Sequence, residues 1–417
     1  MRIGYACIAL GRPGSKMKSC ILRNANEQLL LSLIASNLDS LNQLIEYNIR
    51  NNISLFRISS DLIPFGSSVA ANLPWQALYA QKLAEIGTKI KNSGMRVSMH
   101  PGQYTVLNSP DESVAQRAVQ DLEYHTRVLD SLGVGAEHKI ILHLGGAYGD
   151  KNQAIKRFVS RYQELNPAVK SRLVLENDDK IFNIDDVLIT ASATGIPAVF
   201  DNLHHAVNPA GEDGSEFDWI HRCSETWSGE DGPQKIHYSQ QHPDKKRGAH
   251  SDFIAIDPFL EFYHQISNRN IDIILEVKDK NLSALKCIHC VSNLEISILE
   301  NEWAHYKYSV LERSAEHYNA IRKLLKDKNT YPAIEMYHLI EDALRTPLEK
   351  GNAINAAQHV WGYFKDKAST TEKRRFQDVL HKLEWGNNDN NYVKSTLFAM
   401  ANKYQEQYLL NSYYLYI

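Results

Sequence analysis

The sequence has few cysteines and no long apolar run. Its 417 residues include only five cysteines, an odd and scattered set that fits reduced thiols better than a disulfide framework. Cys287 and Cys290 have the spacing of a metal or redox pair, but no second pair accompanies them, and we expect a structural role. The opening residues MRIGYACIALG lack the apolar stretch of a signal peptide, and no segment approaches the roughly 18 apolar residues of a membrane span. We therefore expect a cytoplasmic protein with no membrane partner.

An excess of positive charge is also missing. The formal net charge of −3 is not typical of a nucleic-acid-binding protein. An enzyme needs only a local basic surface, however, and metal ions can add positive charge in a cleft. Short basic clusters lie within residues 12–23, 245–247 and 373–375, although such runs are more often solvated faces than binding sites. The charge balance therefore argues only weakly against nucleic acid as a partner.

Short apolar runs alternate with helical patterns along the first 295 residues. The eight runs are Ile3–Ala6, Ser54–Ile58, Arg96–Met99, Lys139–Leu142, Leu173–Leu175, Ala198–Phe200, Lys235–Tyr238 and Asp272–Leu275. Strands that alternate with helices indicate a parallel sheet with crossover helices, and eight such units can close a barrel. We predict an α/β protein in which a (β/α)8 TIM barrel over residues 1–295 is followed by a smaller all-α domain over residues 296–417.

One crossover helix carries clear start and stop signals. Ser109 is expected as its N-cap and Pro110 as its first residue, with two acidic residues directly after them. Gly133 is expected to end the helix. His125 falls on the apolar stripe of this helix, so we interpret it as a core histidine.

Nearly every predicted strand ends in a polar or ionisable residue. In a barrel all strand C-termini open onto one face, so residues that are distant in sequence converge there. The strand-end residues are Tyr5, Ser60, Asp61, His100, His143, Glu176, Asp201, His237 and Glu276. One such residue is unremarkable, and Asp201 alone would be read as a cap of the following turn, but the whole series indicates a functional site.

The converging side chains offer both nitrogen and oxygen ligands. The candidate metal ligands are the imidazoles of His100, His143, His204, His237 and His250 and the carboxylates of Glu176, Asp201 and Glu276. Such mixed sets suit Zn, Mn or Fe better than Ca or Mg. Eight ligands exceed the needs of one ion, so two or three ions about 3.5–4 Å apart are expected, an arrangement suited to in-line attack at a phosphate.

Lys235 lies two residues before His237 and points to the same side of its strand. A cationic lysine inside a metal-rich barrel is costly. It would repel the metals, be neutral, or be modified to a carboxylate that bridges two ions, and its position alone leaves all three open.

Several strings together resemble one known family, the UV damage endonucleases. They are RISSD at 57–61, HPGQY at 100–104, HLGGAYG at 143–149, LENDDK at 175–180, FDNLHH at 200–205 and HSD at 250–252. The resemblance covers roughly residues 1–290 and implies a barrel related to the endonuclease IV group. It further implies a monomer that nicks damaged double-stranded DNA immediately 5′ of UV photoproducts and some other lesions, with manganese as the metal.

The resemblance also assigns roles to residues. It places the metal ligands on His100, His143, Glu176, Asp201, His204, His237, His250 and Glu276, with Lys235 as a carboxylated lysine. Within this set, Glu176, Lys235, His237 and Glu276 are the expected catalytic residues. Gln103 and Tyr104 match a pair that wedges into the duplex at the lesion, and Tyr5 matches a further residue near that point. One position departs from the family, because Ser68 stands where a metal-binding histidine is expected, and one ion would then lack a ligand.

Beyond residue 295 the pattern is helical. Helices are expected over Trp303–Leu325, Tyr331–Leu344, Ala353–Lys365, Thr371–Leu383 and Val393–Leu410. This region resembles a helical domain of unknown function and holds twelve of the 21 tyrosines. Tyrosines at helical spacing are more often core residues than a base-stacking platform. A contribution to DNA binding is a hypothesis that depends on these aromatics and on the basic cluster at 373–375.

Two alternative functions remain open from the sequence. Barrels with His, Asp, Glu and Lys at the mouth also run metal-dependent aldose–ketose chemistry, so a sugar isomerase is one alternative. The other is a lesion-binding protein whose catalysis is impaired by Ser68 in place of the ligand histidine. The ligand number and the Gln103–Tyr104 pair argue against the first, and a nick at damaged DNA would exclude the second.

Overall fold

The computed structural model describes residues 1–12, 14–211, 214–386 and 390–417. The chain forms two compact units. The first consists of residues 1–9, 14–254 and 258–285, and the second of residues 10–13, 255–257 and 286–417. Within the described residues, no helix is both long enough and apolar enough to cross a membrane.

Parallel strands of the first unit close into a barrel in chain order. They are β1 (Ile3–Ala6), β2 (Leu55–Ile58), β3 (Arg96–Met99), β4 (Ile140–His143), β5 (Leu173–Glu176), β6 (Ala198–Asp201), β7 (Gln234–Tyr238) and β8 (Ile271–Leu275). Pairing of β1 with β8 closes the circle. The predicted (β/α)8 barrel is thus confirmed, and each predicted strand differs from the observed one by at most one residue at either end.

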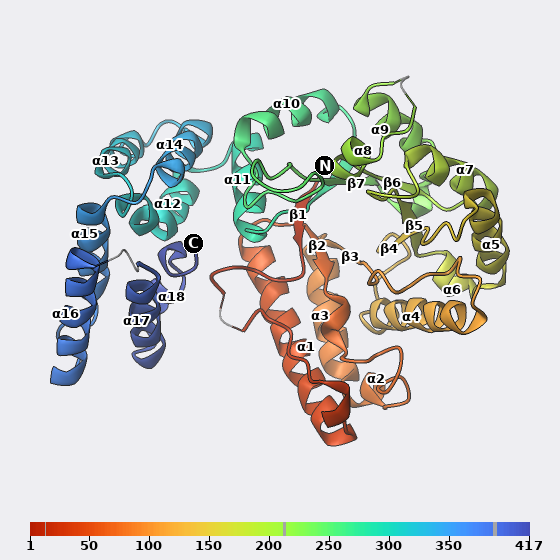
Figure 1. Cartoon of the computed structure of the whole chain (residues 1–417), viewed down its shortest axis with the longest axis horizontal. Helices are drawn as coiled ribbons and strands as arrows, with labels where there is room; N and C mark the ends of the chain where they lie inside the picture. Colours follow the sequence, from red (N-terminus) through yellow and green to blue (C-terminus); the bar gives the residue numbers. More distant parts are fainter. Residues whose placement is uncertain (13, 212–213, 387–389) are drawn as a thin grey trace. The chain divides into compact units, whose positions relative to one another are not determined.

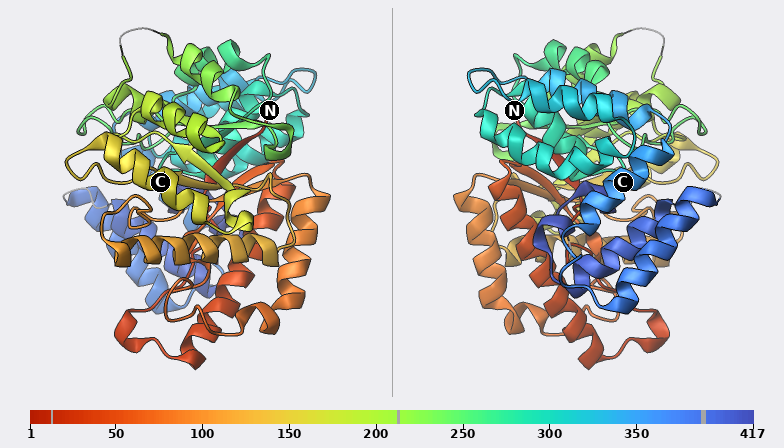
Figure 2. Two further views of the ribbon diagram at one scale, coloured as in Figure 1. Left: turned by 90° about the vertical axis from the view of Figure 1, so that its right-hand side faces the viewer. Right: turned by 90° about the vertical axis from the view of Figure 1, so that its left-hand side faces the viewer.

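Crossover helices cover the outside of the strands (Figures 1 and 2). They are α1 (Glu27–Arg50), α2 (Trp75–Leu78), α3 (Ala80–Asn92), α4 (Glu112–Ser131), α5 (Lys151–Glu164), α6 (Pro167–Lys170), α7 (Ile184–Thr194), α8 (Asn202–Val207), α9 (Glu216–Ser224), α10 (Ile256–Ile266) and α11 (Asn281–Val291). Neighbouring crossover helices pack together, as α1 and α3 do (Figure 1). Apolar strand and helix faces bury each other in this way, which is the main stabilising contribution in a layered α/β fold.

The start of α4 corrects one sequence prediction. Asp111, not Ser109, is its N-cap, because the Asp111 carboxylate accepts hydrogen bonds from the backbone amides of Ser113 and Val114. The Ser109 hydroxyl instead accepts a hydrogen bond from the Asp111 amide, just before the helix begins. An ionised carboxylate near the positive end of the helix dipole is more stabilising than a neutral hydroxyl there. The end is as predicted, since Gly133 follows the helix with φ of 65°.

Buried charges lie near the starts of the strands, at the N-terminal end of the barrel. Arg96 donates to Asp272 at 2.9 Å, and Arg2 donates to the same carboxylate at 3.2 Å. Lys139 donates to Asp231 at 2.5 Å. Each of these carboxylates has a cationic partner, which is the condition under which buried charge is tolerated. This end of the barrel is therefore closed by paired charges.

The second unit is helical. Its helices are α12 (Ile296–Leu311), α13 (Ala315–Leu324), α14 (Ala333–Arg345), α15 (Lys350–Trp361), α16 (Thr370–Trp385), α17 (Asn390–Lys403) and α18 (Gln407–Leu410). The single helix predicted over residues 303–325 is wrong, because Ser314 caps a new helix by accepting from the His317 amide. Ala356, Val360, Phe364, Leu397 and Tyr414 lie in the core of this unit.

Candidate metal centre

Six neighbouring strands, β3 to β8, deliver the candidate ligands to one end of the barrel. His143, Glu176 and Asp201 are the last residues of β4, β5 and β6. The register pairs His143 with Glu176 and Asp201 with His237, so these side chains stand level around the mouth. His100 and Glu276 directly follow β3 and β8. The C-terminal face of the barrel therefore collects ligands that span more than 170 residues of sequence.

Glu176 is the common member of three potential metal-binding groups. They are His100, His143 and Glu176; Glu176, Asp201 and His204; and Glu176, His237 and Glu276, each with ligand atoms within 4.8 Å of one another. One carboxylate oxygen lies 2.9 Å from His100 Nε2, and the other lies 2.7 Å from His237 Nδ1. A carboxylate shared in this way can bridge ions, so the arrangement has room for more than one.

The mouth of the barrel is electrostatically prepared for cations. Burial alone would raise the pKa of Glu176, but His237 and His143, with hydrogen bonds from His100 and His237, hold that pKa well below its ordinary value. Burial raises the pKa of Asp201, against the effect of His204. For the imidazole of His204 burial acts in the opposite direction and would lower the pKa, but the Asp201 and Glu176 carboxylates raise it to about 9. Coupled carboxylates and imidazoles of this kind are typical of functional sites.

Unpartnered polar atoms show that these residues fit a divalent metal. Asp201 Oδ1 caps α8 by accepting from the His204 amide at 2.7 Å. Its Oδ2 atom is buried with no hydrogen-bond partner among the described residues, and so is Nε2 of His237. Burying such atoms without a partner is costly, and a cation bound beside Asp201 and His204 would satisfy the Oδ2 atom of Asp201. Mixed nitrogen and oxygen donors are what Zn, Mn and Fe accept.

Lys235 is completely buried inside the barrel on β7. Within the described part of the chain, its Nζ atom makes no hydrogen bond. Burial and the Arg96 guanidinium hold the pKa of Lys235 well below its ordinary value. Of the three options left open by the sequence, a cationic ammonium is therefore the least compatible with this position.

Arg57 is a site residue that the sequence reasoning missed. It lies on β2, and its guanidinium donates to the Glu276 carboxylate. Burial opposes the charge of Arg57, but Glu276 keeps its pKa above the ordinary value. An arginine within a buried four-residue strand, LFRI, is the signal that would have marked it. Arg57 fixes the orientation of one candidate ligand.

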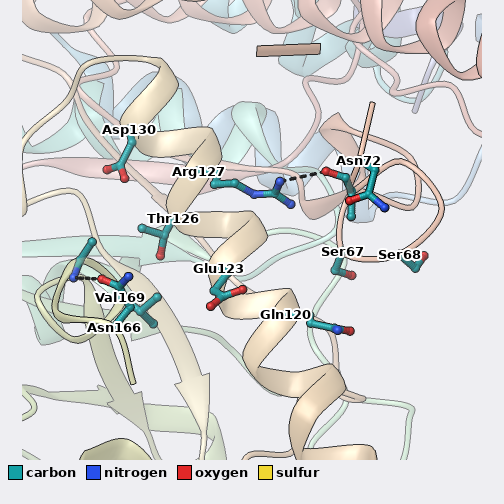
Figure 3. A pocket seen from close by; sticks show the side chains of 12 residues that line it. Ser67, Ser68, Asn72, Gln120, Glu123, Thr126, Arg127, Asp130, Asn166 and Val169 are labelled. Atoms are coloured by element: carbon teal, nitrogen blue, oxygen red, sulfur yellow. Dashed lines mark hydrogen bonds between the residues drawn. The ribbon is translucent and has the colours of Figure 1, made fainter. Parts of the chain in front are cut away.

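Two predicted positions lie outside the three ligand groups. His250 lies in the loop after β7 and forms an isolated antiparallel bridge with Gln241 of the same loop; among the described residues it joins none of the three groups. Ser68 lies in the loop between β2 and α2, where it lines a surface pocket of about 550 Å³ with Glu123 and Arg127 of α4 (Figure 3). None of the carboxylates and imidazoles of the three groups lines this pocket.

The predicted DNA-contacting residues fall in two different environments. Tyr5 has no exposed surface, and its hydroxyl donates to Asn48 of α1 at 2.8 Å, between strand β1 and that helix. The contact of Tyr5 with DNA stays a prediction. Gln103 and Tyr104 are exposed in the loop between β3 and α4, with 84% of Tyr104 accessible.

Comparison with known proteins gives a consistent result. The profile of a family described as UV-endonuclease UvdE matches residues 1–303, and that of a protein of unknown function (DUF1722) matches residues 307–417. A Clostridium perfringens protein named UV DNA damage endonuclease is 39% identical over 391 residues, covering 92% of this chain and 93% of the relative. A Bacillus cereus protein of the same name is 32% identical over 305 residues, covering 70% and 95%. The crystal structure of SacUVDE matches with a TM-score of 0.64 at 37% identity, covering 70% of this chain and 98% of that chain.

Proposed function

The chain belongs to the UV-endonuclease UvdE family, and from this premise we propose that it nicks damaged double-stranded DNA immediately 5′ of UV photoproducts and some other lesions. It is a DNA repair endonuclease, a hydrolase of phosphodiester bonds. This membership decides against the sugar isomerase alternative. The single observation that carries the proposal for this site is the sharing of Glu176 by three ligand groups on one face of the barrel.

The metal-dependent chemistry is the first part of the proposal. We assign His100, His143, Glu176, Asp201, His204, His237, His250 and Glu276 as ligands of two or three divalent ions, with manganese as the metal. Bound ions would supply a metal-activated water and stabilise charge on the phosphate oxygens. The protein's contribution is orientation, since Arg57 fixes Glu276 and the Asn177 carbonyl accepts from His204 Nδ1 at 2.9 Å. Partners of this kind hold a ligand in its binding geometry.

Lys235 belongs to the same proposal as a carboxylated lysine. A neutral amine adds carbon dioxide and releases a proton, which gives a carbamate with two oxygen donors. Support comes from the complete burial of Lys235 and from its Nζ atom, which no described residue satisfies. A carbamate that binds metal ions would replace this unpartnered amine. Together with Glu176, His237 and Glu276, Lys235 forms the proposed catalytic set.

Lesion recognition is assigned to Gln103 and Tyr104. A side-chain wedge can fill the space left when damaged bases leave the stack, and a weakened base pair lowers the cost of extrusion. The exposure of Tyr104 on the face that carries the ligands supports this role.

The experiment that tests the proposal is cleavage of a duplex that carries one site-specific pyrimidine dimer. Purified protein is treated with a chelator, assayed with and without added Mn2+, and the products are mapped at nucleotide resolution. We expect a Mn2+-dependent nick directly 5′ of the dimer and none in the matched undamaged duplex. Specific binding without a nick at saturating Mn2+ would favour the lesion-binding alternative and would make Ser68 the position to restore to histidine.

A further inference from the structure

Helix α4 holds the loop that follows β2. Tyr124 donates to the Ser60 carbonyl at 2.7 Å, and Arg127 donates to the Ala71 and Gly66 carbonyls at 3.0 and 3.2 Å. Figure 3 shows Arg127 reaching from α4 toward this loop. Loops with few such anchors are the parts of a structure that open most easily. The side chains of one helix therefore tie down this loop on the ligand-bearing face.

The loop that follows β3 contains a tight turn with the two wedge candidates at its tip. The Thr105 amide donates to the Gly102 carbonyl at 3.0 Å, which leaves Gln103 and Tyr104 as the two central residues. Both central residues are exposed, whereas Thr105 is buried. The turn thus projects two side chains from a base that is held inside the protein.

The far side of this turn is anchored to α4 through Thr105. Its hydroxyl donates to Asp121 Oδ2 at 2.6 Å. Because the acceptor is a carboxylate, this hydrogen bond is of the stronger, charge-assisted kind. Only about a fifth of the Asp121 side chain is exposed, which limits competition from water.

The near side of the turn is anchored through Ser60 and His125. Ser60 Oγ donates to the His100 carbonyl at 2.7 Å, and the Nε2 atom of His125 lies 2.9 Å from the same hydroxyl oxygen. The other ring nitrogen of His125, Nδ1, lies 2.6 Å from the Asp121 backbone carbonyl. His125 is buried, as the sequence predicted, but its ring links α4 to the loop and does not merely fill the core.

We propose that Asp121 and His125, one turn apart on α4, are positioning residues that clamp both ends of the turn bearing Gln103 and Tyr104. The clamp fixes how far these two side chains project, so the cost of ordering them is met before DNA binds. Preorganisation of this kind strengthens binding without adding a contact. The inference rests on the proposed function, and it predicts an effect on lesion discrimination with little effect on the chemical step.

The test uses Thr105→Val in the full chain, which removes the hydroxyl donor and nearly keeps the shape. Thr105→Ser restores the hydroxyl, and Thr88→Val is the matched control, because the Thr88 hydroxyl donates to the Ala84 carbonyl of its own helix, α3. Fluorescence anisotropy in a chelator gives the ratio of Kd values for undamaged and dimer-containing duplexes. Insertion of the wedge is followed by 2-aminopurine opposite the dimer, and Mn2+-dependent cleavage gives KM and kcat.

We expect Thr105→Val to lower the Kd ratio and raise KM by about tenfold, the size expected for one hydrogen bond to a charged group. The kcat should stay within about twofold, and Thr105→Ser and Thr88→Val should resemble the unmodified protein. Asp121→Ala should lower the ratio at least as much, and adding Thr105→Val to it should have no further effect, because the two residues share one contact.

Two results would overturn the clamp, and they differ from failure of the proposed function. An unchanged Kd ratio in Thr105→Val, or a fall in kcat with the ratio intact, would show that the contact does not position the wedge. If the unmodified protein bound damaged and undamaged duplexes equally, the proposed function itself would be wrong, and the clamp would fall with it.

Discussion

The barrel and the C-terminal helical unit both bury ionisable side chains, but they do so in different ways. At the barrel mouth, Glu176 is surrounded by His100, His143, His204 and His237, all within 4 Å of its oxygens. In the helical unit, Glu302 is equally buried, yet its partner is a neutral phenol, the Tyr413 hydroxyl at 3.4 Å. The first arrangement concentrates charged ligands, and the second isolates one carboxyl.

This contrast shows why burial of a charged residue does not by itself mark a functional site. Burial raises the pKa of Glu302 to about 7, despite the Tyr413 hydrogen bond and the charge of Arg12. The same burial acts on Glu176, but convergent imidazoles reverse its effect and keep that carboxylate ionised. Convergence of unlike ligands from separate strands is therefore the feature that separates the candidate metal centre from a buried polar contact.

The largest expected effect comes from removing the charge at the shared ligand. Glu176→Gln should lower the rate of nicking by about 10⁴-fold, because all three ligand groups lose their common carboxylate and each 1.4 kcal/mol of lost stabilisation is tenfold. Glu302→Gln makes the same change in the helical unit and should leave the rate within about twofold. Single-turnover cleavage and bound-metal content measure both. If both variants lost the same share of the nicking rate, Glu176 could not be assigned to the metal centre on this ground.

A second prediction compares the two ends of the barrel. Asp272 lies at the opposite end from the ligands, with Arg96 and Arg2 as partners. Asp272→Asn should lower the free energy of unfolding by about 3 to 5 kcal/mol, since it leaves a buried guanidinium poorly paired. Cleavage per folded molecule should not change. Asp342→Asn removes an exposed partner of Arg345 and should cost less than about 1 kcal/mol. Both changes are measured by urea unfolding.

Much of the barrel could be predicted because its signals are local. Short buried strands alternate with capped helices. A few adjacent residues mark the end of each strand, as in β4, where an apolar run ends at the polar residue His143. Three local predictions failed. The helix predicted over Val393–Leu410 is interrupted, because α17 ends at Lys403 and α18 begins at Gln407. The other two failed where neighbouring polar residues competed. Asp111 took the cap expected of Ser109, and Ser314 started a new helix inside a pattern that looked continuous.

The contacts within the candidate site were harder to predict from the sequence, because they join residues that are far apart along the chain. The converging ligand types could be predicted, since strand ends must meet on one face of a barrel. Nothing local shows that Arg57 reaches Glu276, 219 residues away, or that His125 meets Ser60 across 65 residues. Enclosure is equally hard to predict, because a residue near a strand end, such as Tyr5, can be wholly buried.

A third prediction uses the raised pKa of Glu302. The unfolded carboxyl titrates near 4.5 and the folded one near 7. Between these values the folded state keeps a proton that the unfolded state has lost, so stability should fall as pH rises through this window. The loss should reach about 2 to 3 kcal/mol by pH 8 and be absent in Glu302→Gln. Urea unfolding of both proteins from pH 4.5 to 8 measures it, and parallel curves would show that Glu302 is ionised in the fold.

The smallest effect is expected from the basic cluster on α16, which the sequence left as a possible DNA contact. Tyr306, Tyr308, Tyr337, Tyr413 and Tyr414 are all buried, so these tyrosines form core and offer no stacking platform. The three basic residues at 373–375 are exposed, but α16 also carries Glu372, Asp378 and Glu384. Replacing the three basic residues with glutamine should change Kd for undamaged duplex by about twofold or less and leave its salt dependence intact. A slope of log Kd against log salt that falls by about 2.7 would mean that all three contact phosphates, and DNA binding would then extend to the helical unit.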